Sequence, residues 1–289
     1  MTAGEYKRKI DAALEDSFRG AEGMPFEGLT EAMRYSLLAG GKRIRPMLVL
    51  EFCRICGGDT DAAMSVACAI EMLHTYSLIH DDLPCMDNDT LRRGRPTNHV
   101  VYGECVATLA GDALQAEAFG TILRSELPAE RRALCAGYLA DAVGLDGMCG
   151  GQYLDMLGEN RLLTEEELTD INSRKTGALL IAACRMGVAA AGGSEEQTEA
   201  AARYGAAIGA AFQLRDDMLD VIGSVQELGK TIGSDAQEKK NTYMSLFGPE
   251  RCAQMIEKLT ASAKEALSGA FDDTDFLCAL ADSMAVRMS

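Results

Sequence analysis

Aspartates gathered at the end of an apolar segment are the first residues whose type and spacing could do chemistry. Residues 80–89 read HDDLPCMDND, and they follow an apolar stretch, 62–79, that contains no Gly or Pro and therefore predicts a buried helix. Because Pro84 disfavours helical geometry in the residue before it, Asp81 and Asp82 should fall on the last helical turn. Carboxylates crowd one another there and face the negative end of the helix dipole, so they require cations.

This cluster offers oxygen ligands, and no Cys-His pattern lies near it. Such a set favours Mg²⁺, which keeps several waters and prefers carboxylate and phosphate oxygens. A solvated acidic loop would explain the stretch on its own, but a second cluster, with Asp216, Asp217 and Asp220, closes another apolar run. Gln213, Asp216 and Asp220 share one helical face by their spacing. The two clusters together predict two banks of carboxylates that face one cavity.

Basic residues form two further clusters in this acidic chain. Residues 40–46 read GGKRIRP, so Lys42, Arg43 and Arg45 stand at the start of a helix, and residues 92–95 read RRGR. Backbone N–H groups at a helix start, together with cations, suit an anion such as phosphate. A solvated basic loop is the alternative for each stretch. Cations placed next to carboxylates indicate a polyanion bridged by metals, which a diphosphate would satisfy.

Histidine adds a candidate on the helix before the first aspartate cluster. Glu71, His74 and Asp81 lie on one face of that helix, because their spacing is i, i+3 and i+10. His74 is then either a ligand contact or a satisfied core residue, and the spacing leaves both open. His80 lies off this face and is expected to support the carboxylates. His99 belongs to no such arrangement and is expected to be structural.

The elements that position these residues are expected to be helices, because strand signals are almost absent and Ala, Leu, Met and Glu dominate. Breaks fall at Gly pairs, at Pro128 and in the segment 223–234. No linker, composition shift or fixed-period repeat divides the chain, so one all-α domain over residues 1–289 is predicted. The expected helices span residues 3–20, 28–39, 45–56, 60–82, 103–125, 129–144, 149–157, 164–190, 195–222, 240–246, 248–269 and 273–286.

Composition narrows the class of protein. Apolar residues make up 47% of the 289 residues, enough for a sizeable core, and no run of 18 charge-free apolar residues could span a bilayer. A net charge of −16 argues against nucleic acid and anionic membranes as partners. Ten cysteines without regular spacing fit reduced thiols. Residues 1–10 lack the apolar centre of a signal peptide, so a cytoplasmic protein is expected.

Motifs in a fixed order along the chain resemble the trans-isoprenyl diphosphate synthase family, most closely its bacterial farnesyl diphosphate synthase branch. They are GGKRIRP at 40–46, HDDLPCMD at 80–87 with RRG at 92–94, GDAL at 111–114, GGQ at 150–152, KTG at 175–177 and FQLRDDMLD at 212–220. The resemblance implies a single-domain helical barrel around a deep central cavity, usually in a homodimer. It also implies three Mg²⁺ ions between the two aspartate clusters when diphosphate is bound.

The resemblance further implies roles for single residues. Metal ligands would be Asp81, Asp82, Asp87, Asp216, Asp217 and Asp220, and the catalytic set would be Asp81, Asp82, Asp87, Asp216 and Lys175. The allylic diphosphate would be bound by Arg92, Lys175, Thr176, Gln213, Lys230 and Lys240, and isopentenyl diphosphate by Lys42, Arg45, His74 and Arg93. Two positions depart from the family. Asn88 replaces an Asp of many bacterial relatives, and Met288-Ser289 after Arg287 replaces a basic tail.

The activity implied is head-to-tail condensation of isopentenyl diphosphate with dimethylallyl and geranyl diphosphates, which gives farnesyl diphosphate and releases diphosphate. Geranylgeranyl diphosphate synthesis is the first alternative. A class I terpene cyclase is the second, and it needs no second diphosphate pocket, so Lys42, Arg45 and His74 argue against it. A non-catalytic subunit of a heteromeric synthase is the third. Such a subunit would be expected to lose one aspartate cluster, and this chain keeps both.

Product length is expected to depend on the helix that carries Asp81. Spacing alone nominates Ser77 and Leu73, below Asp81 on its face. The resemblance implies Tyr76 instead, because farnesyl-producing bacterial relatives carry a bulky aromatic five residues before the first Asp of this motif. A ring at the floor of the cavity would block a further isoprene unit by sterics. Ordinary core packing of Tyr76 is the alternative.

Overall fold

The structure, a computed structural model, describes residues 1–18, 23–159, 161–227 and 241–286, with the side chains of 220–227 outside this description. Helices make up nearly all of the regular structure in these ranges, so the all-α prediction is confirmed. Two compact units can be distinguished, one of residues 1–136 and 189–192 and one of residues 137–188 and 193–289. The predictions of a single domain and a central cavity stay predictions.

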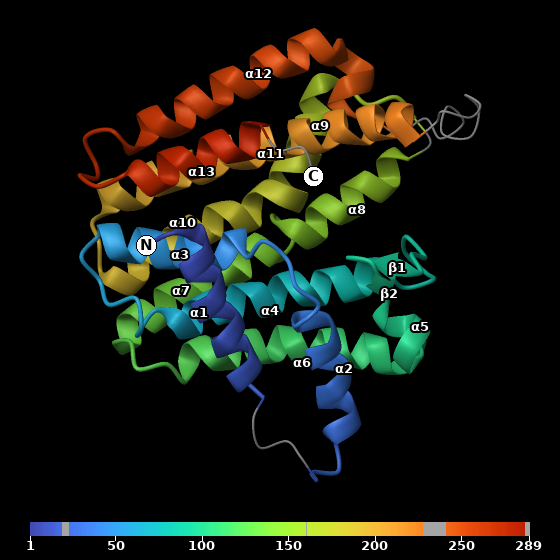
Figure 1. Ribbon diagram of the computed structural model, residues 1–289, viewed down its shortest axis with the longest axis vertical. Coiled ribbons are helices and arrows are strands. Elements are labelled where there is room, and N and C mark those ends of the chain that lie inside the picture. Colours follow the sequence, from blue (N-terminus) through green and yellow to red (C-terminus); the bar gives the residue numbers. More distant parts are fainter. Residues whose placement is uncertain (19–22, 160, 228–240, 287–289) are drawn as a thin grey trace. The chain divides into compact units, whose positions relative to one another are not determined.

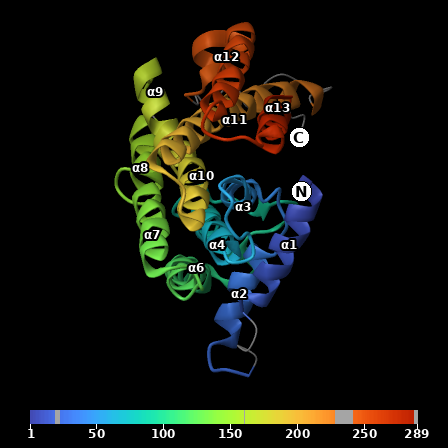
Figure 2. The ribbon, with the colours of Figure 1, turned by 90° about the vertical axis from the view of Figure 1, so that its left-hand side faces the viewer.

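The first unit is built around α4 (Met64–Asp81), whose apolar residues face every side, so that most of the helix is buried. α6 (Glu104–Leu123) runs beside α4, and α3 (Ile44–Ile55) and α1 (Ala3–Asp16) also pack against it (Figures 1 and 2). The unit further contains α2 (Glu27–Leu37), α5 (Asn98–Tyr102) and the first half of α7 (Ala129–Val143). A short antiparallel pair, β1 (Leu91–Arg92) and β2 (Arg95–Pro96), precedes α5.

A glycine-rich loop joins α2 to α3. Gly41 has a φ of 127°, and a side chain at this position would meet the Arg93 guanidinium, whose Cζ would lie 2.9 Å from the added Cβ. Arg43, only 3% exposed, donates to Asp11 Oδ1 at 2.9 Å, to Glu71 Oε1 at 2.7 Å and to a backbone carbonyl of α2 at 2.9 Å. Arg43 thereby ties the loop to three helices of this unit.

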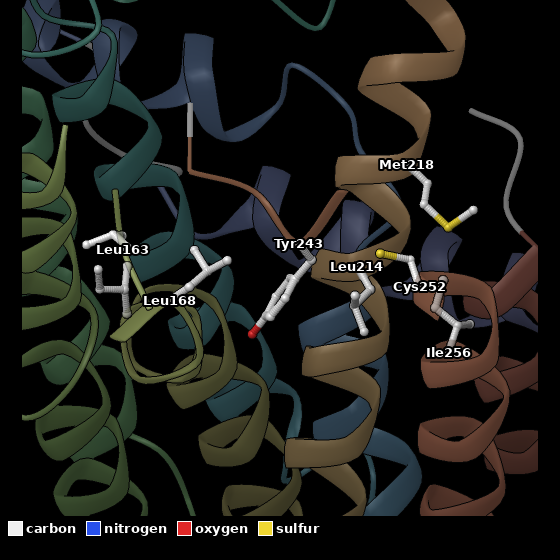
Figure 3. Close-up of a cluster of buried hydrophobic side chains, with 8 residues drawn as sticks. Leu163, Leu168, Leu214, Met218, Tyr243, Cys252 and Ile256 are labelled. Carbon is white, nitrogen blue, oxygen red and sulfur yellow. The ribbon is translucent and has the colours of Figure 1, made fainter. Parts of the chain in front are cut away.

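In the second unit, α11 (Glu195–Glu227) packs against α12 (Tyr243–Leu267) and α13 (Asp275–Val286), as Figure 1 shows. The unit also contains α8 (Met148–Gly158), α9 (Glu165–Asn172), a π-helical turn named η1 (Ser173–Gly177) and most of α10 (Ala178–Ala191). An apolar cluster joins α9, α11 and α12, with Tyr243 between Leu168 and Leu214 in Figure 3. Its buried members are Leu163, Leu168, Ile171, Leu214, Met218, Tyr243, Cys252 and Ile256.

Three expectations about the elements are wrong. The expected helix 164–190 is interrupted by η1, and α11 continues beyond residue 222 to Glu227. The stretch between α4 and α6, where no element was expected, contains β1, β2 and α5. A fourth expectation, the break near residue 247, is confirmed, because Gly248 before Pro249 interrupts the helical geometry of α12 with φ 73° and ψ 170°.

Within the described ranges, no helix combines the length and apolar character needed to cross a membrane. The cysteines differ in exposure. Cys85, Cys105 and Cys149 are exposed, whereas Cys53, Cys68, Cys135, Cys184 and Cys252 are buried, and their reduced state stays a prediction.

Candidate active site

The first aspartate cluster lies where α4 ends. α4 stops at Asp81 with Asp82 as its cap, so the predicted termination before Pro84 is confirmed. The chain then folds back, because the N–H of Asp87 donates to the Asp81 carbonyl at 2.9 Å and the N–H of Asn88 donates to the Leu83 carbonyl at 3.1 Å. These bonds satisfy carbonyls that the helix end leaves open. They also hold Asp87 close to the last turn of α4, where a shared metal site would need it.

Asp82 is the most buried of these carboxylates that the structure describes. It is 3% exposed, and burial raises the pKa of its carboxyl, while Arg92 opposes that rise. Arg92 Nε lies 2.6 Å from Asp82 Oδ1, and its Nη2 lies 3.1 Å from Asp89 Oδ2. Arg92, expected to bind the allylic diphosphate, is thus fixed by the carboxylates themselves.

The donors at this helix end fit Mg²⁺ that is shared with a diphosphate. Asp81, Asp82 and Asp87 supply hard oxygen ligands. In the part of the chain that the structure describes, no three His, Cys, Asp or Glu side chains are grouped so that they could hold a metal ion by themselves. Mg²⁺ usually takes one or two carboxylates and completes its octahedron with water and substrate phosphate. The cluster therefore suits ions that a diphosphate helps to hold.

Three arginines of the same unit, Arg43, Arg45 and Arg93, lie near the single carboxylate of Glu71. Arg45 Nε is buried and has no hydrogen-bond partner within the described ranges. Burial lowers the pKa of the Arg45 and Arg93 guanidinium groups, and Glu71 acts against this for both. Glu71, however, is already paired with Arg43 at 2.7 Å. A buried cation that lacks a full partner is unfavourable, so this cluster suits an incoming anion.

His74 lies among these cations. Burial, followed by the charges of Arg45 and Arg93, lowers the pKa of His74 well below its ordinary value, so the imidazole is neutral at pH 7. Lys42 is exposed on the adjoining loop, and Arg93 donates to the carbonyl of Gly40 on that same loop. The structure thus brings together Arg45, His74 and Arg93, which the sequence assigned to one substrate.

Lys175 is placed by the π-helical turn η1 in the second unit. Its Nζ lies 2.7 Å from Asp155 Oδ2 on α8. α8 approaches η1 so closely that a side chain at Gly151 would overlap the backbone nitrogen of Lys175 and lie 2.8 Å from Arg174 Cβ. π turns recur at functional sites because the extra residue re-aims the neighbouring side chains.

A chain of hydrogen bonds runs from η1 into the second aspartate cluster. The Thr176 hydroxyl donates to Gln213 Oε1 at 3.2 Å, and Gln213 Nε2 donates to Asp217 Oδ1 at 2.9 Å. Asp217 Oδ2 accepts the backbone N–H of Tyr243 at 2.8 Å. Thr176 and Gln213, both assigned to the allylic substrate, are therefore neighbours.

The other predicted residues of this unit are described less fully. Asp216 is half-buried on α11. Asp220 is also on α11, but its side chain is outside the described part. Lys230, Lys240 and Arg287 lie outside the described residues altogether, so their assignments stay predictions.

The residues proposed to set product length lie on α4. Tyr76 is 6% exposed and its ring meets the edge of the His80 ring at a centroid distance of 5.5 Å. Ser77 Oγ donates to the His74 carbonyl at 2.9 Å, and Leu73 is fully buried. His80 Nε2 lies 3.0 Å from the Thr108 carbonyl of α6, so it links two helices.

Sequence reasoning missed Asp155 and the pairing of Asp217 with Tyr243. Asp155 follows Gly151 by one helical turn, which would have placed both on one side of α8. No comparable local signal exists for Tyr243, which is 26 residues from Asp217 along the chain. His99, expected to be structural, has its Nδ1 3.2 Å from the Thr97 hydroxyl.

The fold and these residues define an enzyme class. Residues 26–272 match the model of the polyprenyl synthetase family, so the chain belongs to this family of trans-prenyltransferases. Over 96% of this chain and 78% of the relative, it is 50% identical to geranylgeranyl pyrophosphate synthase 3, chloroplastic, of Arabidopsis thaliana. It is 45% identical to the farnesyl diphosphate synthase of Bacillus subtilis over 90% of this chain and 89% of the relative.

Solved structures agree with this assignment. The apo structure of an FPP/GFPP synthase from Zymomonas mobilis matches with a TM-score of 0.88 at 34% identity, over 98% of this chain and 97% of the other. The predicted resemblance to the family and its all-α fold are thereby confirmed.

Proposed function

We propose that the protein condenses isopentenyl diphosphate with dimethylallyl and geranyl diphosphates to give farnesyl diphosphate. The observation that carries this proposal is the group of Arg45, Arg93 and neutral His74, in which Arg45 Nε is buried and has no partner in the described part of the chain. A diphosphate supplies several oxygen atoms that accept from these donors. The carboxylates at the end of α4 would hold a diphosphate through Mg²⁺, whereas this group would donate to one directly. Two sites of such different chemistry support two anionic substrates.

We assign the allylic diphosphate to Arg92, Lys175, Thr176 and Gln213. Mg²⁺, when bound with Asp81, Asp82, Asp87 and Asp216, would supply Lewis-acid stabilisation of the departing diphosphate. Arg92 and Lys175 add positive charge where negative charge develops as the allylic C–O bond breaks. Each already faces a carboxylate, Asp82 and Asp155 respectively, which limits its motion before the substrate arrives.

We assign isopentenyl diphosphate to Lys42, Arg45, His74 and Arg93. Held by its diphosphate, this substrate attacks the allylic cation through its double bond, and a new C–C bond forms. Loss of a proton to the departed diphosphate then restores a double bond, so the product carries one more isoprene unit. A site that excludes water protects the cation during this step.

Two product lengths have support. Tyr76, five residues before Asp81, favours farnesyl diphosphate, and the Bacillus subtilis relative is a farnesyl diphosphate synthase. The 50% identical Arabidopsis thaliana relative is a geranylgeranyl pyrophosphate synthase, which favours a chain one unit longer as the second candidate. A terpene cyclase needs no second diphosphate pocket, so Arg45, His74 and Arg93 would have no substrate in such an enzyme.

A homodimer is the assembly that we propose. One side of α6 packs against α4, whereas Cys105, Leu109, Ala116 and Leu123 of the same helix are exposed. These residues recur at helical spacing and form an apolar stripe that a second copy of the chain could cover.

Separate effects on the two substrates test the assignment. Arg45→Ala should raise the KM for isopentenyl diphosphate by roughly 10- to 150-fold, because a charged hydrogen bond to phosphate contributes about 1.5–3 kcal/mol. Lys175→Ala should act on the allylic substrate instead, and Arg8→Ala, at an exposed position of α1, controls for loss of a positive charge. Equal effects of Arg45→Ala on both substrates would contradict the assignment.

A further inference from the structure

We propose that Asp217 is a positioning residue that joins the start of α12 to Gln213 and does not bind a metal. The hydrogen bonds that carry this proposal stand by themselves, and its consequence for catalysis rests on the proposed function.

Both oxygens of the Asp217 carboxylate are already engaged. Oδ1 accepts from Gln213 Nε2 at 2.9 Å, and Oδ2 accepts from the backbone N–H of Tyr243 at 2.8 Å. The residue is 7% exposed, so little of it is open to solvent. Each oxygen keeps a second lone pair, but the two donors and the burial leave little room beside them for Mg²⁺, which holds on to several of its waters.

The start of α12 needs this carboxylate. Thr242 caps the helix, its Oγ1 accepts the N–H of Ser245 at 3.1 Å, and Ser245 Oγ accepts the N–H of Thr242 at 3.1 Å. The N–H of Tyr243 is among the first-turn donors that a helix cannot satisfy internally, and Asp217 accepts it. A negative charge at this end is also favoured by the helix dipole. Tyr243 itself is buried in the apolar cluster of Figure 3, so its backbone is held in place.

The same carboxylate determines how the Gln213 amide is oriented. A carboxylate only accepts, so Gln213 must turn its NH₂ group toward Asp217 and its carbonyl oxygen toward Thr176. The Thr176 hydroxyl then donates to that oxygen at 3.2 Å. Asp217 therefore acts on the proposed allylic site through Gln213.

Asp216, the neighbour of Asp217 on α11, is the residue to which we give the metal role instead. Neighbouring residues of an α-helix point about 100° apart, so Asp216 does not share the direction in which Asp217 meets Gln213 and Tyr243. Asp216 is half-buried, and we assign the metal role of this pair to it alone.

Two readouts on Asp217→Ala, Asp217→Asn and the matched control Asp216→Ala test the proposal. The first is amide hydrogen exchange at residues 243–246 without substrate or metal. Loss of the acceptor in Asp217→Ala should speed exchange by roughly 2- to 30-fold, as expected for loss of a helix cap. Asp217→Asn keeps a carbonyl acceptor and should restore most of the protection, and Asp216→Ala should leave it as in the wild type.

The second readout is the Mg²⁺ concentration that gives half-maximal turnover. It should stay within about two-fold of the wild-type value in Asp217→Asn and rise at least about ten-fold in Asp216→Ala. An equal rise in both variants, or unchanged exchange in Asp217→Ala, would overturn the proposal. A wild-type protein that transfers no prenyl group would contradict the proposed function, while the exchange experiment would still decide the role of Asp217 at α12.

Discussion

Residues of one type have different roles because their partners differ. Arg43 donates to Asp11, Glu71 and a backbone carbonyl, whereas Arg45 Nε has no partner within the described ranges. Arg43 is therefore a structural cation, and Arg45 is the one with hydrogen-bonding capacity left for a substrate. The sequence KRIR does not distinguish the two arginines, because the difference lies in the contacts of Arg43 with α1 and α4.

His74 predicts a pH dependence of stability. Burial and the nearby arginines hold the pKa of His74 in the folded protein well below its ordinary value of 6.5. As the pH falls below about 6.5, the unfolded chain takes up a proton at His74 that the folded chain does not, so the free energy of unfolding decreases.

His74→Gln keeps a neutral polar side chain and should lose this part of the pH dependence. Urea unfolding of both proteins at several pH values between about 7.5 and 5 measures it. If the two curves of unfolding free energy against pH run parallel, His74 does not titrate as described.

At the scale of elements, close helix contacts position Lys175. Gly151→Ala would place a Cβ against the backbone of Lys175, so α8 and η1 must separate. We expect the variant to lose roughly 1–3 kcal/mol of unfolding free energy and to raise the KM for the allylic diphosphate.

Gly137→Ala is the matched control for this change. Gly137 is exposed on α7, and a Cβ there would meet nothing within 4 Å, so stability should be unchanged or higher by up to about 1 kcal/mol. Denaturation midpoints and substrate kinetics of both variants check the comparison. A Gly151→Ala protein that behaves like Gly137→Ala would show that the approach of α8 to η1 does not matter.

The sequence predicts elements better than it predicts their interruptions. The end of α4 follows from Pro84 alone, and the kink at Gly248 follows from Pro249. The π turn is not predictable in this way, because no Pro occurs in residues 164–190 and the close contact of the turn is with Gly151 on another helix. The pairing of Asp217 with Tyr243 and that of Lys175 with Asp155 are equally hidden, since each partner comes from another helix.

At the scale of the whole molecule, product length is the property of this prenyltransferase that we expect a single substitution to change most readily. Tyr76→Ala should shift the product to twenty carbons or more while ionisation continues, because the ring that would stop the chain is gone. Tyr76→Phe keeps the ring and should still stop at fifteen carbons. Mass spectrometry of the dephosphorylated alcohols measures both. An active Tyr76→Ala protein that stops at fifteen carbons would move the limit to Ser77 or Leu73.

The most direct measurement combines the wild-type protein with Mg²⁺, isopentenyl diphosphate and either dimethylallyl or geranyl diphosphate. The products are identified by mass, and consumption of each substrate is followed. We predict that both substrates are consumed together and that farnesyl diphosphate accumulates from either starter. Consumption of the allylic diphosphate alone to a cyclic hydrocarbon, or no consumption of either substrate, would contradict the assignment of this chain as a chain-elongating prenyltransferase.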